Sequence, residues 1–203
     1  MTLRTFIAIL ASLIAFSCCQ RPQNNDIQAV QGQFIQNEEP GYFIGANLWY
    51  AGRLAASKEG MARLEKELAY LHGIGVDNLR ILAAEGEDIK ALGKALEQLD
   101  RRGMKAVLFL NNAWEWSYGF ADYLDRATGI RQPRPSTDSY PAYMEAMSCF
   151  STNAQAVALN HEYIKTVVEA LKDSDAIFSW QICNEPRSFS EDKDKKQALV
   201  DYL

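Results

Sequence analysis

The chain has 203 residues, of which 48% are hydrophobic and 23% charged, and its formal net charge is -5. This composition is that of a globular protein and excludes a disordered chain or a disulfide-rich scaffold. A mildly acidic chain also lacks the clustered Lys and Arg residues that bind phosphate backbones, so we expect no nucleic-acid partner.

The first 17 residues have the layout of a secretory signal peptide. Arg4 precedes an apolar stretch. This stretch is too short to span a bilayer, which takes a helix of ~20 apolar residues. The segment ends in Ala15-Phe16-Ser17-Cys18, which resembles a bacterial lipobox, so we predict lipidation at Cys18, with Cys19 as the alternative position. We therefore expect export to the cell surface or outer membrane, with membrane contact only through the lipid. A plain signal peptide and secretion are the alternative.

Residues 18–40 are rich in Gln and Asn, which predicts a flexible tether ahead of a domain covering residues 41–203. Within that domain, short aliphatic and aromatic runs predict four strands: Tyr42–Leu48, Asp77–Leu82, Lys105–Asn111 and Ala176–Cys183. Apolar residues at helical spacing predict three helices between them: one capped by Ser57, one over Ile89–Leu99 and one over Ala154–Lys172. This alternation predicts an α/β fold with parallel strands and right-handed crossovers.

Two architectures fit this alternation, an open doubly wound sheet and a closed (β/α)8 barrel, and both gather ligands at the carboxyl ends of the strands. The turn after the first strand, Gly45–Gly52, lacks the GxGxxG spacing of a dinucleotide site, and the chain has no P-loop Lys. Its two His residues form no Cys/His pattern typical of zinc. We therefore expect neither a cofactor nor a metal.

The connection after the third strand runs for about 40 residues before the next predicted helix, and loops of that length tend to be functional. It carries seven of the chain's aromatic residues: Trp114, Trp116, Tyr118, Phe120, Tyr123, Tyr140 and Tyr143. Their rings could pack on one another as a small aromatic core. Alternatively, exposed rings beside polar strand ends would stack on sugar rings, and we favour such a sugar-binding cleft.

Glu185 follows the fourth predicted strand, between Asn184 and Pro186. Its carboxyl would project into the mouth of the fold, where aromatic surface disfavours the charged form and keeps a proton available for a glycosidic oxygen. Asn184 could bind a sugar hydroxyl, and Arg80 could keep a neighbouring carboxylate ionised. In isolation, Asn-Glu-Pro could equally be a helix-entry turn.

The run Ile177-Phe-Ser-Trp-Gln-Ile-Cys-Asn-Glu-Pro-Arg187 resembles the fourth-strand signature of glycoside hydrolase family 5. Three further pieces agree in order and spacing: Gly45-Ala-Asn-Leu-Trp-Tyr, Gly75-Val-Asp-Asn-Leu-Arg-Ile and Leu108-Phe-Leu-Asn-Asn-Ala-Trp. Over residues 41–190 the chain is most similar to the endo-β-1,4-mannanases of that family, especially their lipoprotein forms. The resemblance implies a (β/α)8 barrel.

The resemblance also implies retaining hydrolysis of mannan, glucomannan or galactomannan. Glu185 matches the acid/base, Asn184 the contact to the 2-hydroxyl of the sugar, and Arg80 the arginine that steadies the nucleophile. Three further candidates bind substrate along the cleft: Trp49, Trp114 and Arg187. The chain departs from the family pattern in two places. Tyr118 stands where the first glycine of a Gly-Gly pair is expected, and the loop over residues 83–88 is shorter than is usual in the family.

In this family the nucleophile follows the seventh strand, whereas the 203 residues reach only about the fourth βα unit. The resemblance therefore implies the amino-terminal half of a barrel, which we expect to be inactive alone and to have unpaired sheet edges. Asp122 and Asp125 are the acidic residues that could still approach Glu185. Two other functions remain open: a cellulase-like β-glycanase of the same family, and a non-catalytic surface lipoprotein that binds glycans.

Overall fold

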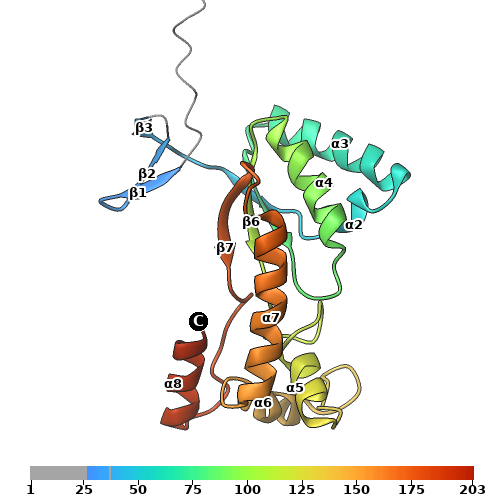
Figure 1. Cartoon of the computed structure of the whole chain (residues 1–203), viewed down its shortest axis with the longest axis vertical. Coiled ribbons are helices and arrows are strands. Elements are labelled where there is room, and N and C mark those ends of the chain that lie inside the picture. The colour runs from blue at the N-terminus through green and yellow to red at the C-terminus, as the bar shows by residue number, and fades with distance from the viewer. Residues whose placement is uncertain (1–26, 37) are drawn as a thin grey trace, which may run out of the picture. The chain divides into compact units, whose positions relative to one another are not determined.

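The computed structural model describes residues 27–36 and 38–203 (Figure 1). The predicted signal segment, Cys18 and Cys19 lie outside the described residues. The chain divides after Tyr42 into two compact units. In the part of the chain that the structure describes, no helix has the length and apolar character needed to cross a membrane.

The first unit contains a small antiparallel sheet of β1 (Gln28–Val30), β2 (Gln33–Gln36) and β3 (Glu39–Pro40), in that order. Gln31 and Gly32 both have positive φ angles (50° and 80°), as the two-residue turn of a tight hairpin requires, and Val30 pairs with Gln33 across it. We predicted a flexible tether over residues 18–40. Within that segment, residues 28–40 form these short paired strands, because the Gln-Gly turn brings β1 and β2 into register.

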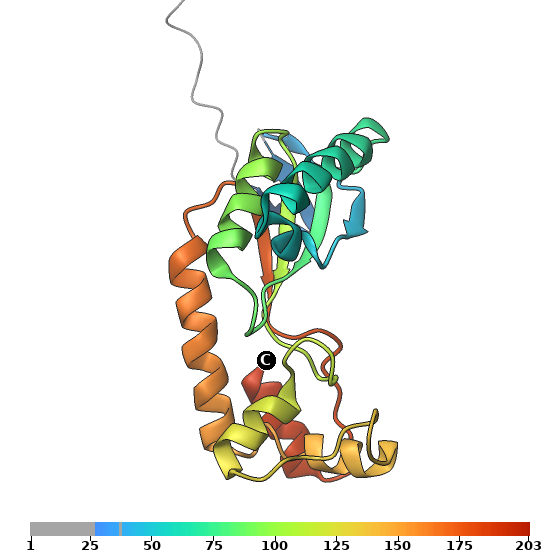
Figure 2. The same cartoon turned by 90° about the vertical axis from the view of Figure 1, so that its right-hand side faces the viewer.

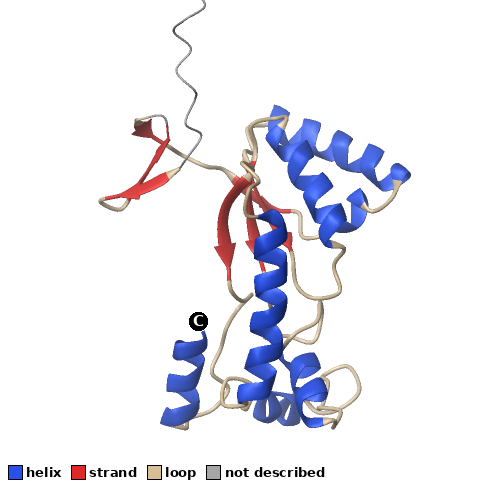
Figure 3. Ribbon diagram, viewed as in Figure 1, coloured by secondary structure: helices blue, strands red, loops and turns tan. Residues whose placement is uncertain are grey.

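The second unit is built on four parallel strands: β4 (Gly45–Asn47), β5 (Asn78–Leu82), β6 (Lys105–Phe109) and β7 (Ile177–Gln181). They are hydrogen-bonded side by side in the order β4-β5-β6-β7, which is their order along the chain. Figure 3 shows strands of this sheet in red with helices beside them in blue. All four coincide with predicted strands, although each is shorter. A sheet that grows in one direction without reversal is the arrangement of a barrel, whereas a doubly wound sheet reverses at a switch point.

Seven helices belong to this unit: α2 (Ala51–Ala55), α3 (Lys58–Gly73), α4 (Ile89–Asp100), α5 (Phe120–Thr128), α6 (Tyr140–Met147), α7 (Ala154–Leu171) and α8 (Lys193–Tyr202). The three predicted helices are α3, α4 and α7. Ser57 caps α3 as expected, since its hydroxyl accepts a hydrogen bond from the Gly60 amide at 3.0 Å. We had not expected α2, α5 and α6.

The two faces of the parallel sheet have different neighbours. Leu79 and Ile81 of β5, with Ala106 and Leu108 of β6, are fully buried in a core that includes residues of α2, α3, α4 and α7. Side chains of opposite parity point to the other face, where Arg80 lies beside Val107 in the register and its guanidinium sits 4.1 Å from the Phe109 ring centroid. This second face leads to the polar strand ends.

The long connection after β6 folds around a second core, formed with residues of α7 and α8. Phe120 and Phe150 stack there at 4.0 Å between ring centroids, and both are buried. Figure 2 shows α7, in orange, running from beside the sheet to α5, in yellow. This second core includes Ala113 and Cys183, so it holds the segments that follow β6 and β7 in place.

Candidate active site

A cavity of about 580 Å³ opens at the carboxyl ends of the parallel strands. It brings together residues from β4, from β5, from the turn after β7 and from the long connection: Asn47, Arg80, Trp114, Glu115, Trp116, Pro135, Tyr140, Asn184 and Glu185. Four of the predicted site residues, Arg80, Trp114, Asn184 and Glu185, are among them. Residues separated by more than a hundred positions therefore meet in one cavity.

A network of amide and guanidinium groups forms the floor of this cavity. Arg80 donates from Nε to Oε1 of Gln181 and from its Nη2 to Oδ1 of Asn184, both at 2.8 Å. Burial lowers the pKa of the Arg80 guanidinium from its ordinary value, and the Glu185 carboxylate acts in the opposite direction. Because an arginine keeps its proton in proteins, Arg80 supplies a fixed positive charge at the strand ends.

Asn184 is buried and held from three sides. Besides accepting from Arg80, its side-chain Nδ2 donates to Oδ1 of Asn112 at 3.0 Å, and its backbone amide donates to the Asn111 carbonyl at 2.8 Å. Asn112 in turn donates to the Trp116 carbonyl at 2.7 Å. The amide pair Asn112 and Asn184 thus couples the turn after β7 to the loop that carries the tryptophans.

Glu185 occupies the left-handed region with φ at 46°, immediately before Pro186. Its Oε2 accepts a hydrogen bond from the Trp114 indole at 2.7 Å and lies 3.8 Å from the Arg187 guanidinium. We expected aromatic surface to shelter this carboxyl, but its side chain is 53% exposed. The indole contacts the carboxylate at its edge and leaves the rest of the group open to solvent.

Trp114 forms the aromatic wall beside Glu185. Its ring stacks near Tyr140 (6.0 Å, 20°) and Tyr143 (6.4 Å, 17°) and meets the edge of Phe189, while the Arg187 guanidinium lies 5.6 Å from its centroid. Part of the aromatic cluster packs as a small core, since Tyr143 is buried, whereas Trp114 and Tyr140 line the cavity. Sugar binding by these cavity-lining rings stays a prediction.

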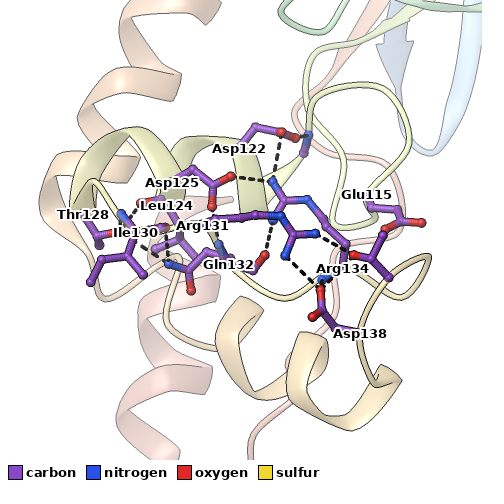
Figure 4. A network of polar contacts seen from close by, with 12 residues as sticks. Glu115, Asp122, Leu124, Asp125, Thr128, Ile130, Arg131, Gln132, Arg134 and Asp138 are labelled. Atoms are coloured by element: carbon purple, nitrogen blue, oxygen red, sulfur yellow. Dashed lines mark hydrogen bonds and ion pairs between the residues drawn. The ribbon is translucent and has the colours of Figure 1, made fainter.

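Two predicted substrate contacts do not line the cavity. Trp49 packs edge-on against Tyr50, and the Arg53 guanidinium lies 5.0 Å from its ring centroid. Arg187 reaches the site only through Trp114 and Glu185. Asp122 and Asp125, the acidic residues that could have approached Glu185, instead bind Arg134 at 3.1 Å and 2.8 Å (Figure 4).

Sequence reasoning missed Glu115, Pro135 and Gln181. Glu115 stands between Trp114 and Trp116, so the aromatic stretch itself was a signal. Pro135 and Gln181 had none, since their positions depend on the folding of distant segments. Among the described residues, no group of three or more His, Cys, Asp or Glu side chains could hold a metal ion.

The arrangement combines an exposed carboxyl, aromatic surface, an oriented amide and a fixed cation. Flat rings offer stacking surface, Asn184 can exchange hydrogen bonds with hydroxyl groups, and Glu185 can transfer a proton at the edge of the cavity. These properties suit a polyhydroxylated ligand.

The sequence model of the glycoside hydrolase family 5 beta-mannosidase-like family matches residues 24–91 and 87–202. The chain belongs to this family. Mannan endo-1,4-beta-mannosidase A of Podospora anserina is 25% identical over 181 residues, which cover 76% of this chain and 43% of that protein. A probable mannan endo-1,4-beta-mannosidase A of Aspergillus flavus is 29% identical over 180 residues, covering 76% and 42%. The chain thus spans less than half the length of these two relatives.

Solved structures of this family share the fold. A family 5 mannosidase of Rhizomucor miehei superposes with a TM-score of 0.71 at 24% identity, over 82% of this chain and 50% of that one. An endo-1,4-beta-mannanase of the same fungus gives a TM-score of 0.66 at 20% identity, over 87% and 56%. The four βα units are therefore part of a (β/α)8 barrel rather than an open sheet.

Proposed function

We propose that this family 5 glycosidase is an exported, retaining, endo-acting enzyme that cleaves β-1,4-mannosidic bonds in mannan, glucomannan or galactomannan. Family membership and the curated mannan endo-1,4-beta-mannosidases support the substrate class. The signal-like residues 1–17 support export, with lipidation at Cys18. The observation that carries the proposal is the Glu185 carboxylate beside Trp114 and the Arg80–Asn184 pair in one cavity.

In this proposal Glu185 is the general acid that protonates the departing glycosidic oxygen and then the base that activates water. The Trp114 indole sets the direction of its carboxylate, and the Trp114 ring offers stacking surface for a sugar. Asn184, whose carbonyl oxygen is engaged by Arg80, would present its amide to a hydroxyl of the sugar under attack. Arg80 would keep the nucleophilic carboxylate charged, and Arg187 would lie on the leaving-group side.

A retaining reaction needs a second carboxyl group ~5 Å from the first. Among the described residues, Glu115 is the other carboxylate that lines the cavity, and its Oε2 is engaged with Ser136. The resemblance assigns the nucleophile to a seventh strand, which these 203 residues do not include. We therefore propose that they bind mannooligosaccharides but turn them over only together with that strand.

The substrate and mode of cleavage are tested by incubating the complete gene product with mannohexaose and cellohexaose and separating the products by chromatography. We expect mannohexaose to be cut internally into shorter mannooligosaccharides, with the newly formed end in the β configuration by NMR. Cleavage of cellohexaose alone would overturn the substrate assignment, and release of mannose alone would overturn the endo mode.

A further inference from the structure

We propose that Glu115 is a specificity-determining residue of the cleft, a carboxylate that selects mannan chains whose ring hydroxyls are free and disfavours O-acetylated ones. This inference rests on the proposed mannan-degrading function. It assigns Glu115 a role in binding, separate from the acid/base role of Glu185.

Glu115 is part of the cavity wall and lies in the chain between two indoles that also line it, Trp114 and Trp116. It is half-buried. Its Oε2 accepts hydrogen bonds from the Ser136 amide at 3.3 Å and the Ser136 hydroxyl at 3.1 Å. Within residues 27–36 and 38–203, both hydrogen bonds that the Glu115 carboxylate accepts reach Oε2, and none reaches its other oxygen, Oε1. One carboxylate oxygen is thus anchored, and the other is left to accept from a ligand.

The segment that anchors Glu115 is itself fixed, as Figure 4 shows. Arg134 donates to Asp122 and Asp125 of α5 and to the Gln132 carbonyl, and its backbone amide donates to Asp138 at 2.9 Å. Burial alone would lower the pKa of Arg134, but the hydrogen bond to Asp125 and the charges of both aspartates outweigh it and raise that pKa. Pro135, which lines the cavity, and Ser136, which binds Glu115, therefore belong to a loop that these contacts hold in place.

A carboxylate accepts hydrogen bonds and cannot donate them, so its natural partners on a neutral glycan are ring hydroxyl groups. Trp114 and Trp116 line the same cavity as Glu115 and can hold the C–H face of a sugar, so that a hydroxyl group at the edge of the ring can donate to Oε1. An acetyl ester removes the donor and leaves the carboxylate desolvated without a partner, which costs more than the loss of an average hydrogen bond. We expect free hydroxyls to be preferred by about tenfold or more.

The test measures the affinity of the 203-residue chain for mannohexaose and for acetylated mannohexaose by calorimetric titration. Three variants are compared with the wild type: Glu115→Ala, Glu115→Gln and, as a control, Glu145→Gln. Glu145 is an exposed acid on α6 outside the cavity, so its variant makes the same charge change away from the glycan. Thermal unfolding of each variant verifies that the fold is retained.

We expect the wild type and Glu145→Gln to prefer the free glycan, Glu115→Ala to bind both glycans about equally, and Glu115→Gln to lie between. Glu115→Gln keeps an acceptor oxygen and nearly the same shape, so it gives an answer even if Glu115→Ala unfolds. An unchanged preference in both Glu115 variants, or a wild type that binds neither glycan, overturns the inference. Failure of the complete gene product to cleave mannan, with the binding preference intact, overturns the proposed function and leaves the selection by Glu115 standing.

Discussion

Glu185 combines a functional side chain with a backbone conformation that L-residues adopt at a cost. Its φ of 46° lies in the left-handed region. There the Cβ atom comes close to the following carbonyl oxygen, and the conformation costs about 1–2 kcal/mol. Strain of this kind persists where the surrounding structure holds it, and here the Asn111, Asn112 and Asn184 contacts fix the preceding residue. The conformation aims the carboxyl at Trp114.

This strain gives a prediction about stability that is independent of catalysis. Glu185→Gly and Glu185→Ala both remove the carboxylate, but only glycine adopts positive φ freely. We expect Glu185→Gly to exceed Glu185→Ala in free energy of unfolding by about 1 kcal/mol, measured by urea denaturation. Equal stabilities would mean that the turn relaxes without the glutamate and that the residue is not strained.

At the scale of elements, the loop after β6 depends on a close approach at Gly119. A Cβ atom at this position would overlap the carbonyl oxygens of Trp114 and Asn112, which belong to the segment forming the site. The neighbouring Tyr118 takes a φ of 54°, where the family pattern has another glycine. Gly119 is therefore required because no Cβ atom fits at its position. The other position of the pair accepts Tyr118, which adopts a left-handed backbone conformation.

We predict that Gly119→Ala lowers the free energy of unfolding by about 2 kcal/mol or more and weakens glycan binding, because backbone must move to admit the methyl group. Gly73→Ala is the matched control, since nothing lies near its added Cβ at the end of α3 and alanine favours a helix by up to about 1 kcal/mol. Chemical denaturation of both variants checks the contrast. A Gly119→Ala protein as stable as Gly73→Ala would show that the loop packs differently.

The parallel strands and the long helices could be predicted from the sequence because their periodicities are local. The elements of the long connection were missed, although Ser139 caps α6 and Pro141 stands in its first turn, both of which are helix-start signals. Site residues that follow strands were found for the same local reason. Glu115 had a local signal in the two flanking tryptophans and was still missed, because its anchor at Ser136 lies 21 residues away and is set by Arg134 and α5.

At the scale of the whole molecule, a thiol and several tyrosine hydroxyl groups that are shielded from solvent make the stability of the fold decrease at high pH. Burial raises the pKa of the Cys183 thiol from 9.0 to about 12, and burial also raises the pKa of four tyrosines: Tyr123, Tyr143, Tyr163 and Tyr202. These groups lose protons at lower pH when unfolded than when folded. Their contribution to stability is therefore full below their ordinary pKa values and declines as pH rises above them.

We predict that the free energy of unfolding falls steeply from pH 9.0 toward about 12, the interval between the two pKa values of Cys183. Cys183→Ala should remove up to about 1.4 kcal/mol per pH unit from this slope, because one fewer proton is linked to unfolding. Denaturant titrations over that interval measure the slope, with Cys149→Ala as the control for losing a thiol elsewhere. If the Cys183→Ala variant had the same slope as the wild type, the raised pKa of Cys183 would be contradicted.

In the proposed function, Glu185 transfers the proton that cleaves a mannoside. The direct test of this claim is the turnover number of the complete gene product on mannohexaose, compared between the wild type, Glu185→Gln and the control Glu145→Gln. Glutamine keeps the shape of Glu185 and an acceptor for the Trp114 indole but has no proton to give, so we predict a loss of about a hundredfold or more in that variant alone. Wild-type turnover by Glu185→Gln would contradict the claim.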